Sequence, residues 1–286
     1  MRIALASCAA FPELDPGDGP LLLAALAQEG LEVEVHAWDA EVDWAAFDLV
    51  VIRTTWDYWD RHEQYLAWAR SVPRLVNSAE VVAWNTDKTY LKRLEAAGIP
   101  TVSTTWISPG DAYALPLEAF VVKPSVSAGA RDTAAYAGGE EAAREHVDRL
   151  LAAGRTVMLQ PYLRAVDTEG ETAVLVFSGE VSHAARKSPV LTIGAGEAAL
   201  GSWSIEPRTA SAAEVELALR VVKEVSRWGD ELLYARIDML PGPVLIELEV
   251  TEPSLFLQEA PGSAQRFAHA VRAWAERSSR AATSPS

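Results

Sequence analysis

The chain has little of several features that define whole classes of protein. Its 286 residues include a single cysteine, Cys8, which excludes an internal disulfide framework and a cysteine-rich zinc site. We interpret Cys8 as a small buried thiol in a reducing compartment. No apolar run reaches the roughly 18 residues of a membrane-spanning helix. The apolar stretch after Met1 is too short for a signal peptide, so we expect a cytoplasmic protein.

Positive charge is also scarce. Lys and Arg total 25 against 40 Asp and Glu, which gives a formal net charge of −15. Nucleic acids and anionic membrane surfaces are bound chiefly through positive charge, so neither is an expected partner. Hydrophobic residues make up 49% and charged residues 23%, the balance of an ordinary folded globular protein.

The first hundred residues alternate between strand and helix patterns. We expect strands over 2–6, 31–36 and 48–53, and helices over 21–28, 61–69 and 87–97. Nearly continuous apolar strands that are separated by helices are typical of a parallel sheet covered on both faces. The sequence therefore predicts an N-terminal α/β lobe.

The rest of the chain has the pattern of α+β structure. Strands are expected over 120–124, 156–160, 173–177, 180–185, 232–240 and 244–250, and helices over 139–153, 212–227 and 264–277. Ser178-Gly179 and Pro241-Gly242-Pro243 are turn sequences, so the last four strands form two hairpins. A tail rich in Ser, Ala and Pro is expected to be disordered.

The second hairpin carries an acidic cluster. Side chains alternate along a strand, so Arg236 and Asp238 share one face, as do Glu247 and Glu249. Carboxylates among Val, Leu and Ile are costly to bury unless a cation meets them, and an oxygen-only set suits Mg²⁺ or Mn²⁺. Two alternatives remain: an edge hairpin whose acidic face is only hydrated, or a pair of glycosidase carboxylates. Neighbouring positions on one strand flank a sugar bond poorly.

Cations that could meet phosphates lie elsewhere in the chain. Lys123 ends a strand and precedes the small-residue segment 125–130, whose backbone N–H groups could approach a phosphate closely. Lys88 lies at the start of the helix expected over 87–97, and Arg186 and Lys187 end a strand. Each of these is equally consistent with a solvated cation or a surface turn. The segment matches neither the P-loop nor the dinucleotide-binding fingerprint.

A third group of residues follows the strand expected over 48–53. Arg53, Asp57 and Tyr58 come directly after it, where open α/β sheets bind ligands, so we treat them as candidate substrate contacts. Trp56 and Trp59 are interpreted as packing residues.

Taken in order, these segments resemble the ATP-grasp superfamily. The matching elements are Lys88, Lys123-Pro124 with its loop, Gln160-Pro161-Tyr162-Leu163, Gly170-Glu171, Ala185-Arg186-Lys187, Arg236-Ile237-Asp238 and the run from Glu247 to Ser254. The last run is similar to the metal-binding strand of glutathione synthetase and D-alanine–D-alanine ligase. The resemblance implies an ATP-grasp fold with lobes at 1–84, 85–158 and 159–278, a tail at 279–286, and ATP held between the second and third lobes.

The resemblance also implies roles for individual residues. Lys88 and Lys123 would contact the ATP phosphates, Gln160 the adenine, and Glu171 the ribose. The implied ATP-binding set is Lys88, Lys123, Ser127, Gly129, Gln160, Pro161, Leu163 and Glu171; the metal ligands are Asp238, Glu247 and Glu249; the catalytic cations are Arg186 and Arg236. Relatives often carry Asn where Glu249 stands, so this site is one charge more acidic. Ser254 joins Arg53, Asp57 and Tyr58 as a candidate substrate contact.

The chemistry implied is ATP-dependent ligation of a small-molecule carboxylate. ATP converts the carboxylate into an acyl phosphate, and a nitrogen then displaces the phosphate. Segments 7–12, 52–58, 84–88 and 252–257 are similar to a bacterial subgroup of cyclo-ligases that close the ring of D-cycloserine from O-ureido-D-serine. Intermolecular ligation, phosphorylation alone, and a nucleotide sensor remain alternatives. Related enzymes are often dimers or tetramers, so a homo-oligomer is compatible with the resemblance.

Overall fold

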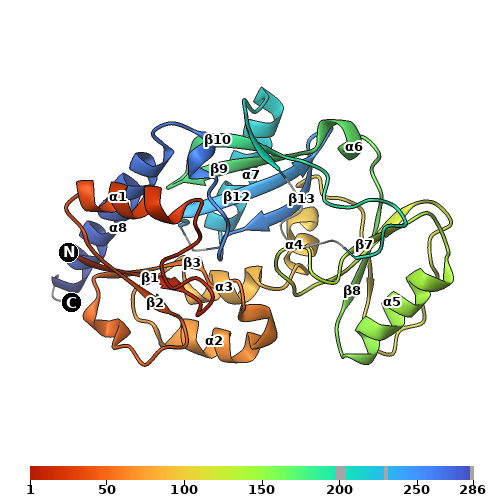
Figure 1. Ribbon diagram of the computed structural model, residues 1–286, viewed down its shortest axis with the longest axis horizontal. Coiled ribbons are helices and arrows are strands. Elements are labelled where there is room, and N and C mark those ends of the chain that lie inside the picture. Colours follow the sequence, from red (N-terminus) through yellow and green to blue (C-terminus); the bar gives the residue numbers. More distant parts are fainter. Residues whose placement is uncertain (198–203, 229–230, 284–286) are drawn as a thin grey trace.

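The computed structural model describes residues 1–286 except 198–203, 229–230 and 284–286. Within these ranges the chain forms three β-sheets in three lobes. Figure 1 shows the N-terminal sheet at one end of the molecule, a lobe with β7, β8 and α5 at the other end, and the sheet of β9, β10, β12 and β13 between them. None of the helices in the described part of the chain combines the length and apolarity that a membrane span requires.

The N-terminal lobe is the parallel α/β unit that the sequence predicts. Its strands are β1 (Arg2–Ser7), β2 (Glu32–Ala37), β3 (Leu49–Thr54) and β4 (Leu75–Val76), in the order β2-β1-β3-β4. All three pairings are parallel. Helix α1 (Gly19–Gln28) packs on one face, and α2 (His62–Ser71) packs on the other among tryptophan and tyrosine rings. Cys8 is buried in the second of these cores, as expected.

The central lobe has a small antiparallel sheet and a hydrophobic core of its own. The strands are β5 (Thr105–Ile107), β8 (Val157–Pro161), β6 (Phe120–Pro124) and β7 (Ala134–Tyr136), given in sheet order, with α5 (Glu141–Ala152) against them. Because β8 pairs with β6 along its whole length, the expected boundary between 158 and 159 is wrong: it would cut a strand of this sheet.

The C-terminal sheet is antiparallel throughout. Its order is β11 (Ile205–Arg208), β10 (Glu180–Lys187), β9 (Glu171–Phe177), β12 (Tyr234–Leu240) and β13 (Val244–Glu249), and the short α6 (Val166–Glu169) precedes β9. Both expected hairpins are present. Ser178 and Gly179 have φ values of 48° and 85°, which a tight two-residue turn requires.

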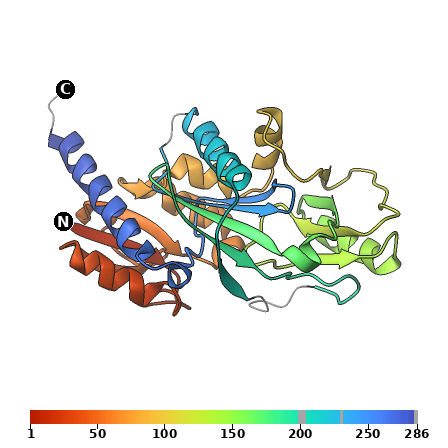
Figure 2. The same cartoon turned by 90° about the horizontal axis from the view of Figure 1, so that it is seen from above.

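Strand alternation gives this sheet two different faces. Val174, Ile237 and Met239 point toward α7 (Ala212–Ser226) and form an apolar core. Figure 2 shows α7 lying over this face. The neighbouring positions point the other way, so Arg236 and Asp238 share the opposite face. The acidic residues of the hairpin therefore face away from α7.

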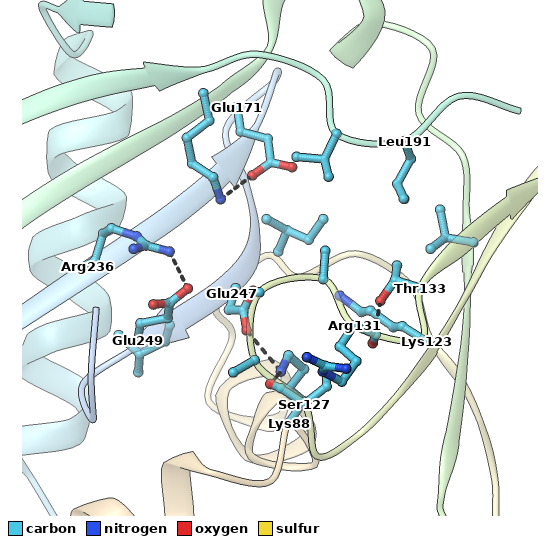
Figure 3. Close-up of a pocket in the computed structure, with 18 of the residues that line it drawn as sticks. Lys88, Lys123, Ser127, Arg131, Thr133, Glu171, Leu191, Arg236, Glu247 and Glu249 are labelled. Carbon is cyan, nitrogen blue, oxygen red and sulfur yellow. Dashed lines mark hydrogen bonds and ion pairs between the residues drawn. The ribbon is translucent and has the colours of Figure 1, made fainter. Parts of the chain in front are cut away.

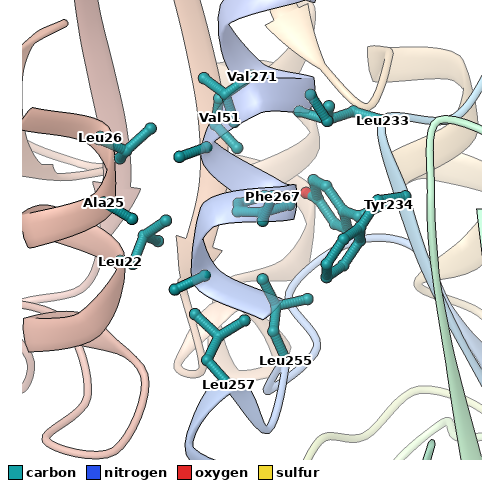
Figure 4. Packing of buried hydrophobic residues seen from close by; sticks show 14 of the residues in the cluster. Leu22, Ala25, Leu26, Val51, Leu233, Tyr234, Leu255, Leu257, Phe267 and Val271 are labelled. Atoms are coloured by element: carbon teal, nitrogen blue, oxygen red, sulfur yellow. The ribbon is translucent and has the colours of Figure 1, made fainter. Parts of the chain in front are cut away.

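The last helix, α8 (Ser263–Thr283), joins the first lobe to the third. It packs against α1 and β3 on one side and against β9 and β10 on the other. Figure 4 shows Phe267 and Val271 between the α1 side chains and Tyr234 of β12. The expected disordered tail over 279–286 is corrected to a helix as far as Thr283, and residues 284–286 lie outside the described ranges.

The helix expected over 87–97 is shorter in the structure, where only α4 (Tyr90–Ala96) lies in that range, and a separate helix that was not expected, α3 (Ala79–Asn85), precedes it. α4 begins after the turn that contains Lys88. The Asp87 carboxylate accepts a hydrogen bond from the backbone of Thr89 at 2.9 Å, which favours a turn over a continuous helix. Short 3₁₀ turns occur at Trp44–Ala46, Tyr58–Asp60 and Leu257–Glu259.

Candidate active site

A cavity of about 640 Å³ lies where the three lobes meet. Its wall takes in β6 and β8 of the central lobe, β9, β10, β12 and β13 of the third lobe, and the segment after β3 of the first. The expected site residues on this wall are Tyr58, Lys88, Lys123, Ser127, Gly129, Gln160, Pro161, Leu163, Glu171, Arg236, Glu247, Glu249 and Ser254. Residues from every part of the expected ATP site thus lie around one space.

Three carboxylates meet on the cavity side of the acidic hairpin. Asp238 pairs with Glu247 across the strands, and oxygens of Asp238, Glu247 and Glu249 lie within 4.8 Å of one another. Such a set of oxygen donors at a cavity edge has the chemistry and spacing that a hard divalent cation needs. The hydrated edge hairpin is excluded because Asp238 is fully buried.

Cationic side chains surround these carboxylates. Lys187 Nζ lies 2.8 Å from Asp238 Oδ2, Arg236 donates to both Asp238 oxygens at 2.9 Å, and Lys88 Nζ lies 3.1 Å from Glu247 Oε1. Figure 3 shows Arg236 facing Glu249 and Lys88 beside Glu247. In this arrangement each buried carboxylate lies next to a positively charged side chain, so neither a positive nor a negative charge is buried without a partner of opposite charge.

The carboxylates titrate differently because their surroundings differ. Burial opposes ionisation of Asp238, yet Arg236 and Lys187 hold its pKa at about 2. Burial raises the pKa of Glu249 to about 7, even though Arg236 opposes the rise. Metal ions bind the ionised form, so protons compete with a cation chiefly at Glu249.

The central lobe contributes a second group of cations. Lys88 donates to the carbonyl oxygen of Ser127 at 2.8 Å, which ties the turn before α4 to the loop after β6. Gly129 in this loop has a φ of 64°, in the region that glycine adopts freely. Burial lowers the pKa of Lys123 to about 8, and the carboxylate of Glu247 limits the fall. The expected phosphate-binding lysines therefore face the expected metal ligands.

The strand end of β8 forms the far side of the cavity. Gln160 is buried and donates from Nε2 to Thr104 Oγ1 at 2.9 Å. Pro161 and Leu163 follow it along the wall. Glu171 at the start of β9 forms an ion pair with Lys187 at 2.8 Å, so it also lies near the carboxylate cluster.

Arg186 does not reach this cavity, and Lys187 takes the place expected for it. Arg186 pairs with Thr172, on the face that turns toward α7, and its Nε donates to the carbonyl oxygen of Glu169 at 2.8 Å. Lys187 is the next residue and points to the opposite face. The expectation for Arg186 was therefore wrong by one position.

Two of the expected substrate contacts also lie elsewhere. Arg53 is buried beneath the cavity floor, where it donates to the carbonyl oxygen of Pro253 and packs on the rings of Tyr234 and Phe267. Asp57 accepts a hydrogen bond from Trp38 at 2.8 Å and faces the first lobe. Both side chains are occupied by protein groups, so neither is a direct substrate contact.

Aromatic residues that we had interpreted as packing line the cavity instead. Trp56 and Trp59 flank Tyr58 on its wall, and Phe11 meets the ring of Trp56 at 4.9 Å between centroids. The guanidinium of Arg131, from the loop after β6, lies 4.1 Å from the Trp59 ring centroid. No spacing rule in the sequence distinguishes such residues from core aromatics.

Glu252 is a further site residue, which lies within the segments 247–254 and 252–257 but was not predicted to take part in the site. It lines the cavity and is 9% exposed. Burial, reinforced by the charge of Glu249, raises the pKa of Glu252 to about 8. The native state thus holds a proton on this carboxyl at pH values where an exposed glutamate has lost it.

A dependence of stability on pH follows from this pKa. Protonated Glu252 stabilises the native state below the ordinary glutamate pKa, and this contribution is lost as pH rises through about 8. We expect Glu252→Gln, free of metal and nucleotide, to lie within about 1 kcal/mol of wild type at pH 5 and to exceed its free energy of unfolding by roughly 3 kcal/mol at pH 9.5. Urea unfolding at both pH values measures the difference, and equal stabilities at pH 9.5 would contradict it.

Comparison with known proteins connects this geometry to a family. Residues 3–77 match the family model of the D-cycloserine synthetase DcsG N-terminal domain. The chain is 35% identical over 279 residues to the cycloserine biosynthesis protein DcsG of Streptomyces lavendulae, covering 89% of this chain and 92% of that protein. The chain belongs to the DcsG family. A crystal structure of D-cycloserine synthetase DcsG shares 32% identity with a TM-score of 0.87, covering 97% of this chain and all of the other.

The fold of this DcsG-family protein is shared more widely. D-alanine–D-alanine ligase from Bacillus anthracis is 14% identical with a TM-score of 0.65, and each chain covers 98% of the other. The expected ATP-grasp fold is therefore confirmed, with a parallel α/β lobe followed by two antiparallel α+β lobes. The protein is an ATP-grasp ligase and acts on a small-molecule substrate.

Proposed function

We propose that this enzyme closes the ring of D-cycloserine from O-ureido-D-serine, with ATP as the activating substrate. The observation that carries the proposal is the cavity itself, in which Lys88 and Lys123 face the carboxylates of Asp238, Glu247 and Glu249 across a space open to the first lobe. Membership of the DcsG family supports the choice of substrate. A cytoplasmic location, a homo-oligomer and the lack of a nucleic-acid partner remain predictions.

ATP is proposed to lie between the central and third lobes. Lys88 and Lys123 would hold its phosphates, with Ser127 and Gly129 in the loop that closes over them. Gln160, Pro161 and Leu163 would border the adenine, and Glu171 the ribose, which would require the Glu171–Lys187 ion pair to rearrange. This division places the nucleotide on one side of the carboxylate cluster and O-ureido-D-serine on the other.

The divalent metal is proposed to be Mg²⁺, held by Asp238, Glu247 and Glu249. Such a cation would offset the negative charge of the ATP phosphates. Arg236 and Lys187 already lie against Asp238 and supply the remaining positive charge to the transferred phosphoryl group.

The reaction has three covalent steps. A carboxylate oxygen of the substrate attacks the γ-phosphorus, the bond to the β–γ bridging oxygen breaks, and ADP leaves. The nitrogen bonded to the side-chain oxygen then attacks the acyl carbon, and inorganic phosphate leaves as the ring closes. D-cycloserine lacks the carbamoyl group, so water must also remove that group, which leaves as CO₂ and ammonia. The residues around the cavity act by positioning the reactants and by stabilising the charge that develops.

Product analysis tests this function. We expect the protein with ATP, Mg²⁺ and O-ureido-D-serine to yield ADP, free phosphate and D-cycloserine, identified by mass spectrometry. Reactions without Mg²⁺ or without the substrate are the controls. ADP release only with a separate carboxylate and amine would replace the cyclo-ligase by an intermolecular ligase, whereas a stable phosphorylated product would indicate a kinase.

A further inference from the structure

The cavity wall on the side of the first lobe has one carboxyl group without an assigned task. This part of the wall consists of Phe11, Trp56, Tyr58, Trp59, Glu252, Ser254 and Phe256, and Glu252 alone among them carries a carboxyl group. Its side chain is nine-tenths buried. A carboxyl group in this setting is costly unless a ligand or a protein group meets it.

The backbone around Glu252 is fixed from two lobes. Trp56 Nε1 donates to the carbonyl oxygen of Glu252 at 2.9 Å, and Arg53 donates to that of Pro253. Arg236 reaches the carbonyl oxygen of Ser254 at 3.3 Å, and the carboxylate of Asp18 accepts from the backbone of Leu257 at 2.7 Å. The segment therefore holds the Glu252 side chain toward the cavity.

Within the part of the chain that the structure describes, no ion pair or hydrogen bond joins the Glu252 carboxyl group to another residue. Its own backbone N–H lowers its pKa slightly. Negative charge from Glu249 and Glu247 acts on it, and Lys88 attracts it only in part. Every other carboxylate of the site faces Lys88, Lys187 or Arg236 directly. A cationic group of the substrate would supply the positive charge that no protein side chain places directly against Glu252.

We propose that Glu252 binds the α-ammonium group of the substrate, so that the substrate class is an α-amino acid whose own carboxylate is activated. The inference rests on the proposed function and deepens it. The α-carbon carries both groups, so an ammonium at Glu252 places the carboxylate toward Arg236, which contacts both Asp238 and the Ser254 backbone. The rings of Trp56 and Tyr58 beside Glu252 offer further favourable surface to a cation.

This contact also determines which nitrogen reacts. A carboxylate beside an ammonium group favours its protonated form, and a protonated nitrogen has no lone pair with which to attack. The α-nitrogen is then held as an inert anchor while the side-chain nitrogen reaches the acyl phosphate.

A matched pair of substrates tests the contact. The desamino analogue 3-(ureidooxy)propanoate differs from O-ureido-D-serine only in the α-ammonium group. We expect Glu252→Gln to raise KM for O-ureido-D-serine by about 30-fold or more while changing KM for the desamino analogue by less than about threefold. KM for ATP should be unchanged, and Glu216→Gln, on the exposed face of α7, should behave as wild type. An equal rise in KM for both substrates would overturn the proposal. A fall in kcat at constant KM would also overturn it, because that result indicates a general base.

Binding measurements separate this proposal from the proposed function. If wild type releases no ADP with O-ureido-D-serine, the cyclo-ligase assignment fails, and calorimetry with D-serine and 3-hydroxypropanoate in the presence of Mg²⁺ and a non-hydrolysable ATP analogue then decides the role of Glu252. We expect wild type to bind D-serine more tightly than 3-hydroxypropanoate and Glu252→Gln to lose that preference. A wild type without the preference, or a variant that keeps it, overturns the proposal.

Discussion

Glu247→Ala is expected to lower kcat for ATP-dependent turnover by about 10³-fold or more while the protein stays folded. Glu247 lies beside Asp238 and Glu249 in the acidic cluster and pairs with Lys88 at 3.1 Å. Its loss removes a proposed metal ligand, and it also removes the charge that keeps Lys123 protonated. Both effects weaken the hold on the phosphates.

The measurement is ADP release over a range of Mg²⁺ concentrations, with thermal unfolding to confirm the fold. Glu216→Ala removes a glutamate from the exposed face of α7 and should leave kcat and the Mg²⁺ dependence unchanged. Chelation of metal from wild type should reproduce the loss, and the variant should gain little from added Mg²⁺. Near-normal ADP release by Glu247→Ala would show that the metal assignment is wrong.

Asn77→Ala should lower the free energy of unfolding by about 4 kcal/mol. Asn77 is fully buried, and its amide donates to the carbonyl oxygens of Tyr234 at 3.0 Å and Val250 at 2.6 Å. Its side-chain oxygen accepts from the backbone of Leu233 at 2.8 Å. Alanine would leave these three backbone groups without partners where water does not reach them, and each such loss is destabilising.

Urea unfolding measures this effect, since the midpoint should fall while the dependence on urea concentration stays constant. Gln28→Ala removes an amide at the exposed end of α1 and should change stability by less than about 0.5 kcal/mol. A loss below about 1 kcal/mol for Asn77→Ala would mean that the backbone groups find other partners.

The sequence predicted what depends on local pattern. The hairpin of β12 and β13 brings Asp238 and Glu247 together because alternation and a tight turn are readable from neighbouring residues. Its register was not predictable, because a bulge after Asp238 shifts the pairing toward the turn. Three-residue strands such as β5 and β7 have too few positions to show a period, so they were missed.

The errors in the site arise from contacts between distant parts of the chain. Arg53 follows a strand end, as ligand-binding residues often do, but Pro253 lies 200 residues further along and takes its hydrogen bond. Arg186 and Lys187 are neighbours of the same charge, and only the pairing of β10 with β9 decides which one faces the cavity. Glu252 lies within the segments 247–254 and 252–257, which carry the family resemblance. Only its burial without a partner distinguishes it from an exposed glutamate.

The position of α8 has a consequence for the order in which the chain can fold as it is synthesised. The N-terminal sheet is synthesised well before α8, which together with α1 covers one of its apolar faces. Until Phe267 and Val271 arrive, that face has only α1 on it and stays open to unwanted association. Completion of the first lobe therefore waits until α8 has been synthesised, and the cavity residues that this lobe contributes reach their final positions with it.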